Sequence, residues 1–195
     1  MTPARPTPTP GSRLRRWTAH LTLLVACIGT VATSPPRSPP VTAEHAGPTL
    51  RLTAESPRAT RHLIVRVSAE DSSHIVEGET WLEFTPRWQT TDPTRAGKPS
   101  LRVLLALEGA DGPMAGDTFP LEAPGGQEPF QASYNSLPHG CTLDQPCEWK
   151  AVLEVEALGE LGEDVVEVDW TAFVIAFVRD TDDMPDGFTV HISEP

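Results

Sequence analysis

Apolar residues recur at every second position over most of the chain. Leu63, Val65 and Val67 follow this rule, and so do Leu82 and Phe84. Successive side chains of a strand point to opposite faces, so this pattern predicts strands that bury one face. Three further sets fit the same alternation: Leu101, Val103, Leu105 and Leu107; Trp149, Ala151, Leu153, Val155 and Ala157; and Phe188, Val190 and Ile192.

The segment 166–178 differs, because it begins with alternation and becomes apolar on both faces from Ala172 to Val178. A strand with other layers on both of its faces has this composition. We therefore expect a central strand that is covered on both sides. Short loops join this segment to its neighbours in the chain, and strands connected in this way usually lie side by side. The last three strands are thus predicted to form a meander.

Turn-forming residues separate the apolar runs, among them Glu77-Gly78, Gly125-Gly126 and Asp186-Gly187. No segment shows the sustained apolar stripe of an amphipathic helix. Roughly eight or nine short strands around one core predict an all-β fold, namely a single antiparallel β-sandwich of immunoglobulin-like or jelly-roll-like shape. We assign this domain to residues 49–195.

The chain before this domain divides into two parts. Residues 1–32 contain three arginines between positions 13 and 16, followed by an apolar run over 21–32. This order is typical of an export signal, and the run is shorter than the roughly 20 residues that a transmembrane helix needs. Residues 33–48 contain five prolines and almost no large apolar side chains. They are predicted to be a disordered, Pro-rich linker, because they cannot bury enough surface to offset the entropy of ordering.

The apolar run contains the sequence Leu24-Val25-Ala26-Cys27. These four residues resemble the lipobox of bacterial lipoproteins, and the resemblance implies lipidation at Cys27 and a membrane contact through the lipid anchor alone. The competing interpretation is an ordinary secretory signal that is cut after Ala32 or after Ala43, since small residues precede both positions. Either way the protein is expected to be exported, and to be either anchored at the outer membrane or periplasm or secreted.

The charge of the chain is uneven. From Glu44 onward it contains 27 acidic and 10 basic residues, a formal net charge of −17. Such a surface repels phosphate backbones, so nucleic acid is excluded as an expected partner. An unknown protein or a glycan is the expected partner instead.

Two cysteines, Cys141 and Cys147, lie six positions apart with Pro146 between them. In an oxidising compartment this spacing predicts a local disulfide. The rival interpretation is a metal centre that also uses His139. Copper and zinc sites need three or four convergent ligands, and no further ligand follows at a suitable spacing. We therefore predict no metal at this position.

The loop near the C-terminus is rich in carboxylates. Clustered carboxylate oxygens are the ligands that Ca²⁺ prefers, but the spacing here does not match a calcium loop, because Met184 stands where a ligand is needed. A solvated hairpin turn is the alternative that we favour. The four residues of this weak calcium candidate are Asp180, Asp182, Asp183 and Asp186.

The chain has no Gly-x-Ser-x-Gly, lactamase or metalloprotease signature, and no catalytic residue or cofactor is predicted. We expect a non-enzymatic binding module. Aromatic side chains are the candidates for its binding surface, because exposed rings stack on sugars and grip protein partners. The alternative function is a carbohydrate-binding module or small hydrolase that uses exposed Trp and surface carboxylates. The aromatic candidates are Trp81, Trp88 and Tyr134.

Overall fold

The computed structural model describes residues 19–20, 36–70, 73–92, 97–108 and 116–195, without the side chains of Ser133 and Tyr134. The segment predicted to be an export signal, with Cys27, lies outside these residues apart from Ala19 and His20. The compact unit runs from Arg37 to Pro195.

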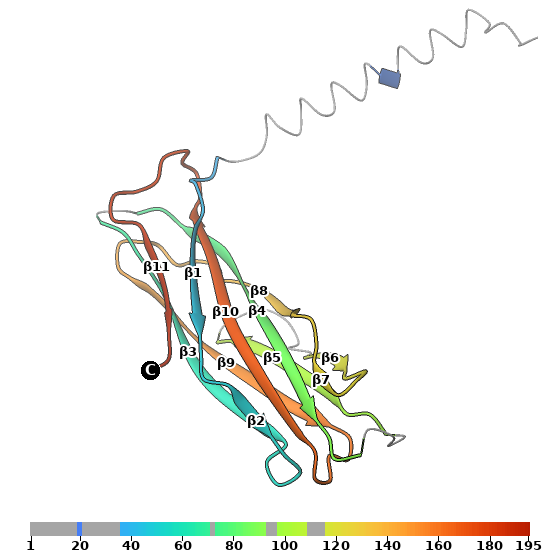
Figure 1. Cartoon of the computed structure of the whole chain (residues 1–195). Helices are drawn as coiled ribbons and strands as arrows, with labels where there is room; N and C mark the ends of the chain where they lie inside the picture. The colour runs from blue at the N-terminus through green and yellow to red at the C-terminus, as the bar shows by residue number, and fades with distance from the viewer. Residues whose placement is uncertain (1–18, 21–35, 71–72, 93–96, 109–115) are drawn as a thin grey trace, which may run out of the picture. The chain divides into compact units, whose positions relative to one another are not determined.

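The compact unit is a β-sandwich of two antiparallel sheets, as the alternation of apolar residues predicts (Figure 1). Sheet 1 consists of β1 (Val41–Ala46), β2 (Leu50–Leu52), β10 (Val165–Val178), β4 (Val76–Gln89), β7 (Gly125–Gly126) and β8 (Phe130–Ser136). Sheet 2 consists of β11 (Thr189–Ser193), β3 (Arg58–Ser68), β9 (Cys147–Leu158), β5 (Ser100–Leu107) and β6 (Asp117–Pro120).

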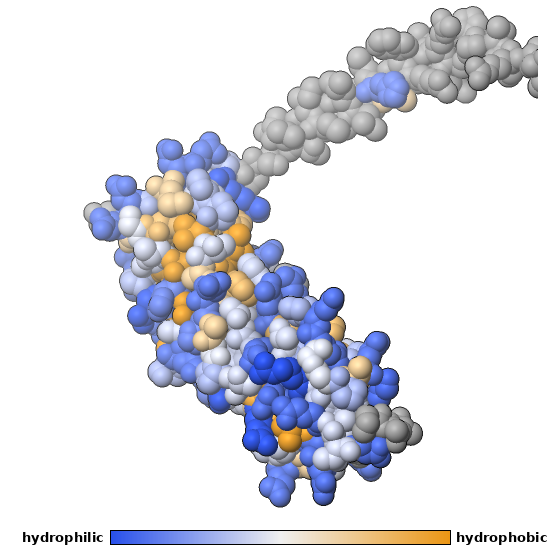
Figure 2. Space-filling model, in the orientation of Figure 1, coloured by the Kyte–Doolittle hydropathy of each residue, from blue (hydrophilic) through white to orange (hydrophobic). Residues whose placement is uncertain are grey.

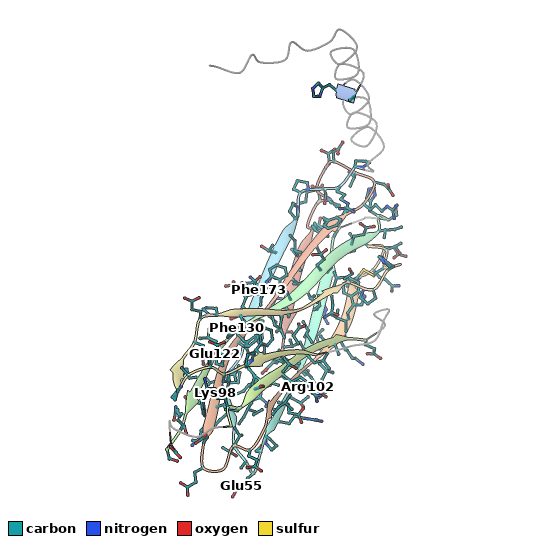
Figure 3. All side chains as sticks on the ribbon, turned by 90° about the vertical axis from the view of Figure 1, so that its right-hand side faces the viewer. Glu55, Lys98, Arg102, Glu122, Phe130 and Phe173 are labelled. Carbon is teal, nitrogen blue, oxygen red and sulfur yellow. A yellow bond between two sulfur atoms is a disulfide. The ribbon has the colours of Figure 1, made fainter. Side chains whose placement is uncertain are left out.

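The core lies between the two sheets, which Figure 3 shows from the side with Phe173 and Arg102 on different sheets. The residues that the alternation singled out face inward, and Leu63, Val65 and Leu105 are almost completely buried. Burial of a large apolar side chain contributes about 1.5–3 kcal/mol relative to exposure. The strands form where the sequence alternates because that pattern alone lets each sheet bury one complete face.

The predicted meander of the last three strands is wrong. β9 and β11 belong to sheet 2, whereas β10 pairs with β1 and β4 in sheet 1. The short loops on either side of β10 therefore cross between the layers. Gly159 and Gly162 adopt positive φ angles of 99° and 61° in the first of these loops, a conformation that glycine adopts without a steric penalty.

The sandwich also begins earlier than predicted, inside the segment 33–48 that was assigned to a linker. Ser38 is buried, its N–H donates to the carbonyl oxygen of Val178 at 2.9 Å, and its Oγ accepts from the Val178 N–H at 2.9 Å. β1 then pairs along its whole length with β10. Because a strand can be held by the hydrogen bonds of its neighbour, β1 forms without large apolar side chains, which are what a composition argument looks for.

Gly47 lies between β1 and β2, where the backbone passes close to the indole ring of Trp170. A Cβ atom at this position would lie 2.0 Å from Cζ2 of that ring. The ring itself is fixed, because its Nε1–H donates to the carbonyl oxygen of Pro48 at 3.1 Å and the residue is buried. A side chain at position 47 can therefore be accommodated only if the corner between β1 and β2 moves.

We predict that Gly47→Ala lowers the free energy of unfolding by about 1–3 kcal/mol, the usual cost of forcing extra volume into a packed site. Urea denaturation followed by circular dichroism measures this change. The matched control is Gly97→Ala, because a Cβ atom on Gly97 would meet no atom of the described residues within 4 Å. Equal stability of the two variants would contradict the close approach.

Candidate functional site

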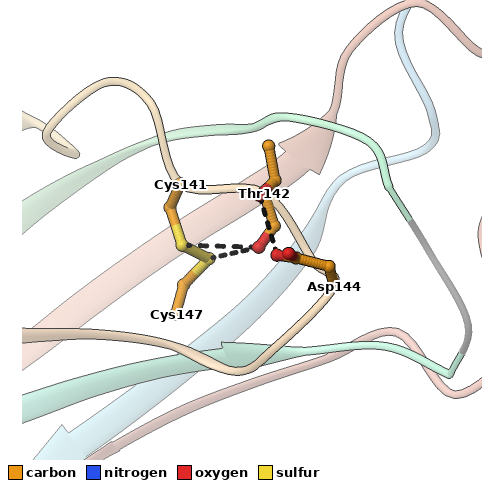
Figure 4. Close-up of a disulfide and its surroundings, with 4 residues drawn as sticks. All are labelled: Cys141, Thr142, Asp144 and Cys147. Atoms are coloured by element: carbon orange, nitrogen blue, oxygen red, sulfur yellow. Dashed lines mark hydrogen bonds between the residues drawn. A yellow bond between two sulfur atoms is a disulfide. The ribbon is translucent and has the colours of Figure 1, made fainter.

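The predicted disulfide between Cys141 and Cys147 is present, with the two Cα atoms 6.0 Å apart (Figure 4). The carbonyl oxygen of Thr142 lies 3.8 Å from Cys141 Sγ and 3.9 Å from Cys147 Sγ. These are close contacts and not hydrogen bonds, because a disulfide sulfur has no proton to donate. The Thr142 hydroxyl donates to Asp144 Oδ1 at 2.8 Å and so closes the turn.

The disulfide loop is fastened to the beginning of β4. The N–H of Val76 donates to the Cys141 carbonyl oxygen at 3.1 Å, and the N–H of Leu143 donates to the His74 carbonyl oxygen at 3.1 Å. Cys147 itself is buried in the core at the first position of β9. The bridge therefore links the start of β9 to the loop that packs on β4.

We predict that reduction of the disulfide lowers the free energy of unfolding by about 2 kcal/mol, because the unfolded chain regains the entropy of a short loop. The midpoint of thermal unfolding should fall by roughly 4–8 °C, measured with and without dithiothreitol. The control is the double variant Cys141→Ala/Cys147→Ala, whose midpoint should not respond to the reductant. An unchanged midpoint for the reduced wild type would contradict the stabilising role.

In the described part of the chain, no group of three or more His, Cys, Asp or Glu residues could hold a metal ion. Both cysteines beside His139 are in the disulfide. In the Asp-rich loop, Asp180 adopts a positive φ of 64°, and the N–H of Asp183 donates to Thr181 Oγ1 at 3.1 Å. The loop thus has the hydrogen bonding of a solvated turn, and its four Asp side chains are exposed.

Two of the three aromatic candidates do not contribute to a described surface. Trp88 is only 2% exposed, and its Nε1–H donates to Asp164 Oδ2 at 3.2 Å. Its ring is therefore part of the core, because position 88 of β4 faces inward, and it is not available to a ligand. Tyr134 lies in β8, but its side chain is outside the described residues.

Trp81 is different, because position 81 of β4 faces outward and its side chain is partly exposed. Its indole ring is parallel to the ring of Phe173 on β10, with the centroids 5.2 Å apart and the planes at 7°. The outward residues Ile175 and Phe177 follow along β10 and are also partly exposed. We call Trp81, Phe173, Ile175 and Phe177 the outer apolar patch, and Figure 2 shows hydrophobic side chains gathered on this face.

Three members of this patch, Phe173, Ile175 and Phe177, were not among the predicted binding residues. Residues 172–178 are apolar on both faces, and this pattern predicted a covering layer on each side. The structure places Ala172, Val174, Ala176 and Val178 in the core, but among the described residues no layer covers Phe173, Ile175 and Phe177. The apolar pattern on both faces was therefore visible in the sequence, but the prediction of a second covering layer was wrong for the described residues.

Polar groups surround the patch in a regular way, since directly opposite residues of neighbouring strands share a face. Glu44 on β1 lies opposite Phe173, and Glu79 on β4 lies opposite Ile175. Neither carboxylate has an ion-pair partner among the residues that the structure describes. Glu83 flanks Trp81 along β4 and accepts a hydrogen bond from Gln131 Nε2 at 2.7 Å. The middle of the patch is thus bordered by three carboxylates.

At the end of the patch near Phe177, the bordering carboxylate is paired with arginines. Glu77 lies opposite Phe177 and contacts the guanidinium groups of Arg37 and Arg179, each at 3.4 Å. The guanidinium of Arg37 also lies over the Phe177 ring, 4.7 Å from its centroid. A hollow of about 400 Å³ lies beside this cluster, and its lining includes Leu137, Ile175, Glu79 and His139.

The rest of the outer surface is more polar. Beyond the patch, Arg87 of β4 pairs with Asp169 at 2.8 Å and with Glu167 at 3.7 Å. On sheet 2, Glu156 of β9 pairs with both Arg58 and Arg102.

The hydrogen bond to Glu156 raises the pKa of the Arg58 guanidinium above its ordinary value.

No Phe, Trp or Tyr is among the described outward residues of β3, β9 and β5. Outward aromatic side chains therefore belong to sheet 1.

Comparison of the chain with models of known protein families finds no match. No curated protein matches it either. In the described part of the chain, none of the helices has the length and apolar character needed to cross a membrane.

Proposed function

We propose that this chain is an exported, non-enzymatic β-sandwich protein of the bacterial cell envelope or extracellular space, and that it binds a protein partner through the outer apolar patch. One observation carries the proposal: four large apolar side chains from two adjacent strands point away from the core and lie together. Contiguous exposed apolar patches with a polar rim mark interaction sites. The carboxylates and arginines around this patch form such a rim.

The geometry of the rings favours a protein over a glycan. Stacking on a sugar requires a ring face that is open to solvent. One face of Trp81 is covered by Phe173, and one face of Phe177 is covered by the guanidinium of Arg37. Rings that are covered in this way do not form a continuous flat platform of open faces for a sugar. Partly covered rings and aliphatic side chains such as Ile175 pack well against the apolar side chains of a protein.

One feature agrees with export, and a second bears on where the chain is processed. The disulfide is compatible with an oxidising compartment, where such bonds persist. The position of β1 also bears on the choice between processing sites. Lipidation at Cys27 or cleavage after Ala32 would leave Ser38 and all of β1 in the mature protein, whereas cleavage after Ala43 would remove half of that strand. We therefore propose processing at one of the two upstream positions.

Intact mass spectrometry of the protein from its native host tests this part of the proposal. We expect a chain that starts at Cys27 with added acyl groups in the membrane fraction, or one that starts at Thr33 in the soluble fraction. In either case it should be lighter by two hydrogens than its reduced form, because the Cys141–Cys147 bridge is closed. A full chain from Met1 with both thiols free would contradict export.

Site-specific cross-linking in the native host tests the binding surface. We predict that a photo-reactive phenylalanine analogue at Trp81 gives a discrete adduct with another protein, because the patch is covered when the partner binds. The same analogue at Leu104, which faces outward on sheet 2, is the matched control and should give none. Adding Phe173→Ser should reduce the Trp81 adduct. Equal labelling from both sheets would contradict a specific surface on sheet 1.

A further inference from the structure

We infer that the outer apolar patch binds a protein segment that places an arginine or lysine side chain over Phe173 and against Glu44. This inference rests on the proposed function and adds the chemistry of the partner. Its basis is a contact that the chain makes with itself at one end of the patch. An aromatic ring opposite a carboxylate on a neighbouring strand occurs again in the middle of the patch, at Phe173 and Glu44.

Arg37 provides the template. Its guanidinium lies 4.7 Å from the centroid of the Phe177 ring and contacts Glu77 at 3.4 Å. Glu77 lies directly opposite Phe177 on the neighbouring strand. A cation above an aromatic ring and beside a carboxylate gains from the ring quadrupole and from the ion pair together. An aromatic ring with a carboxylate opposite it is thus already used as a cation site in this fold.

Phe173 and Glu44 form a similar aromatic–carboxylate pair on the other side of β10, since Glu77 belongs to β4 and Glu44 to β1. They lie directly opposite one another on β10 and β1. Trp81 covers the β4 side of the Phe173 ring, so its other face is turned toward β1, where Glu44 stands. Among the described residues, no cationic side chain is recorded over this ring or against this carboxylate. Within the described part of the chain, the second aromatic–carboxylate unit is therefore without a cation, and we assign this place to a side chain of the partner.

The surroundings favour a cation that belongs to an apolar segment. Glu79 and Glu83 border the same region, so three carboxylates surround Trp81, Phe173 and Ile175. An anionic partner, including a second copy of this acidic chain, would be repelled there. Ile175 and Leu137 offer apolar surface for neighbouring residues in the 400 Å³ hollow, whose lining also includes Glu79 and His139. The long stem of arginine or lysine packs on such a surface while its charged head stays near the carboxylates.

The test is an NMR titration of the ¹⁵N-labelled protein, produced from the full sequence, with two capped nine-residue peptides. One peptide alternates leucine with arginine, and the other replaces each arginine with citrulline, which has the same shape and no charge. We expect the arginine peptide to shift the amide signals of Glu44, Phe173 and Ile175. The citrulline peptide should bind the same residues roughly three- to tenfold more weakly, the combined effect of an exposed ion pair and a cation–π contact.

Glu44→Gln separates the charge from the apolar contact. It should weaken binding of the arginine peptide roughly two- to fivefold and leave the citrulline peptide unaffected, because only the charged pair couples to the carboxylate. The matched control is Glu154→Gln, since Glu154 faces outward on the central strand of sheet 2. It should change neither affinity.

Equal affinity of the arginine and citrulline peptides, with no effect of Glu44→Gln, would overturn this inference while leaving an apolar protein-binding patch in place. Absence of shifts at the patch with either peptide, or shifts confined to sheet 2, would also overturn it. The cross-linking result at Trp81 then decides separately whether the proposed function stands.

Discussion

The register between β10 and β4 is the constraint on which the rest of sheet 1 depends. The two strands pair residue by residue over their full length, from Val165 opposite Gln89 to Val178 opposite Val76. Side chains alternate between the two faces, so one register decides which residues enter the core. A slip by one residue would turn Glu77, Glu79 and Glu83 of β4 toward the interior. Burial of three carboxylates without partners is prohibitively costly, so the pairing is strongly specified.

The same register explains why the patch exists. The inward residues of β10 near its C-terminal end are small or β-branched, including Ala172 and Ala176, and they pack tightly against the opposite layer. The outward residues of this stretch are larger than the inward ones. Phe173 and Phe177 therefore contribute little to the core between the sheets, and their size has no explanation in the packing of that core. Their size fits the role in partner binding that we propose for the outer surface.

Alternation along the chain was sufficient to predict the fold class and most of the core. Leu63, Val65, Leu82 and Phe84 face inward as expected. Successive side chains of a strand point to opposite faces, so apolar residues at every second position lie on the same, buried face. The disulfide was also predictable, from the spacing of the two cysteines together with the expected oxidising compartment.

The sequence could not show which layer each strand joins. A short loop such as 159–164 can close a hairpin or cross between two sheets, and only the completed core decides between them. β1 was missed because its stability comes from the hydrogen bonds of β10, which a local pattern does not contain. The patch was misread for a related reason. A strand that is apolar on both faces has the same composition whether the second layer belongs to its own chain or to another molecule.

The carboxylates beside the patch have a further consequence, for the solubility of the free protein. An apolar surface on the exposed face of a sheet favours face-to-face contact between two copies of the protein. Such a meeting would bring Glu44, Glu79 and Glu83 of each copy against the same acidic border of the other, and the chain from Glu44 onward already has a net charge of −17. Like charges at this range oppose contact most strongly at low ionic strength. The acidic border therefore opposes self-association through the patch, and this opposition is absent for a surface of opposite sign.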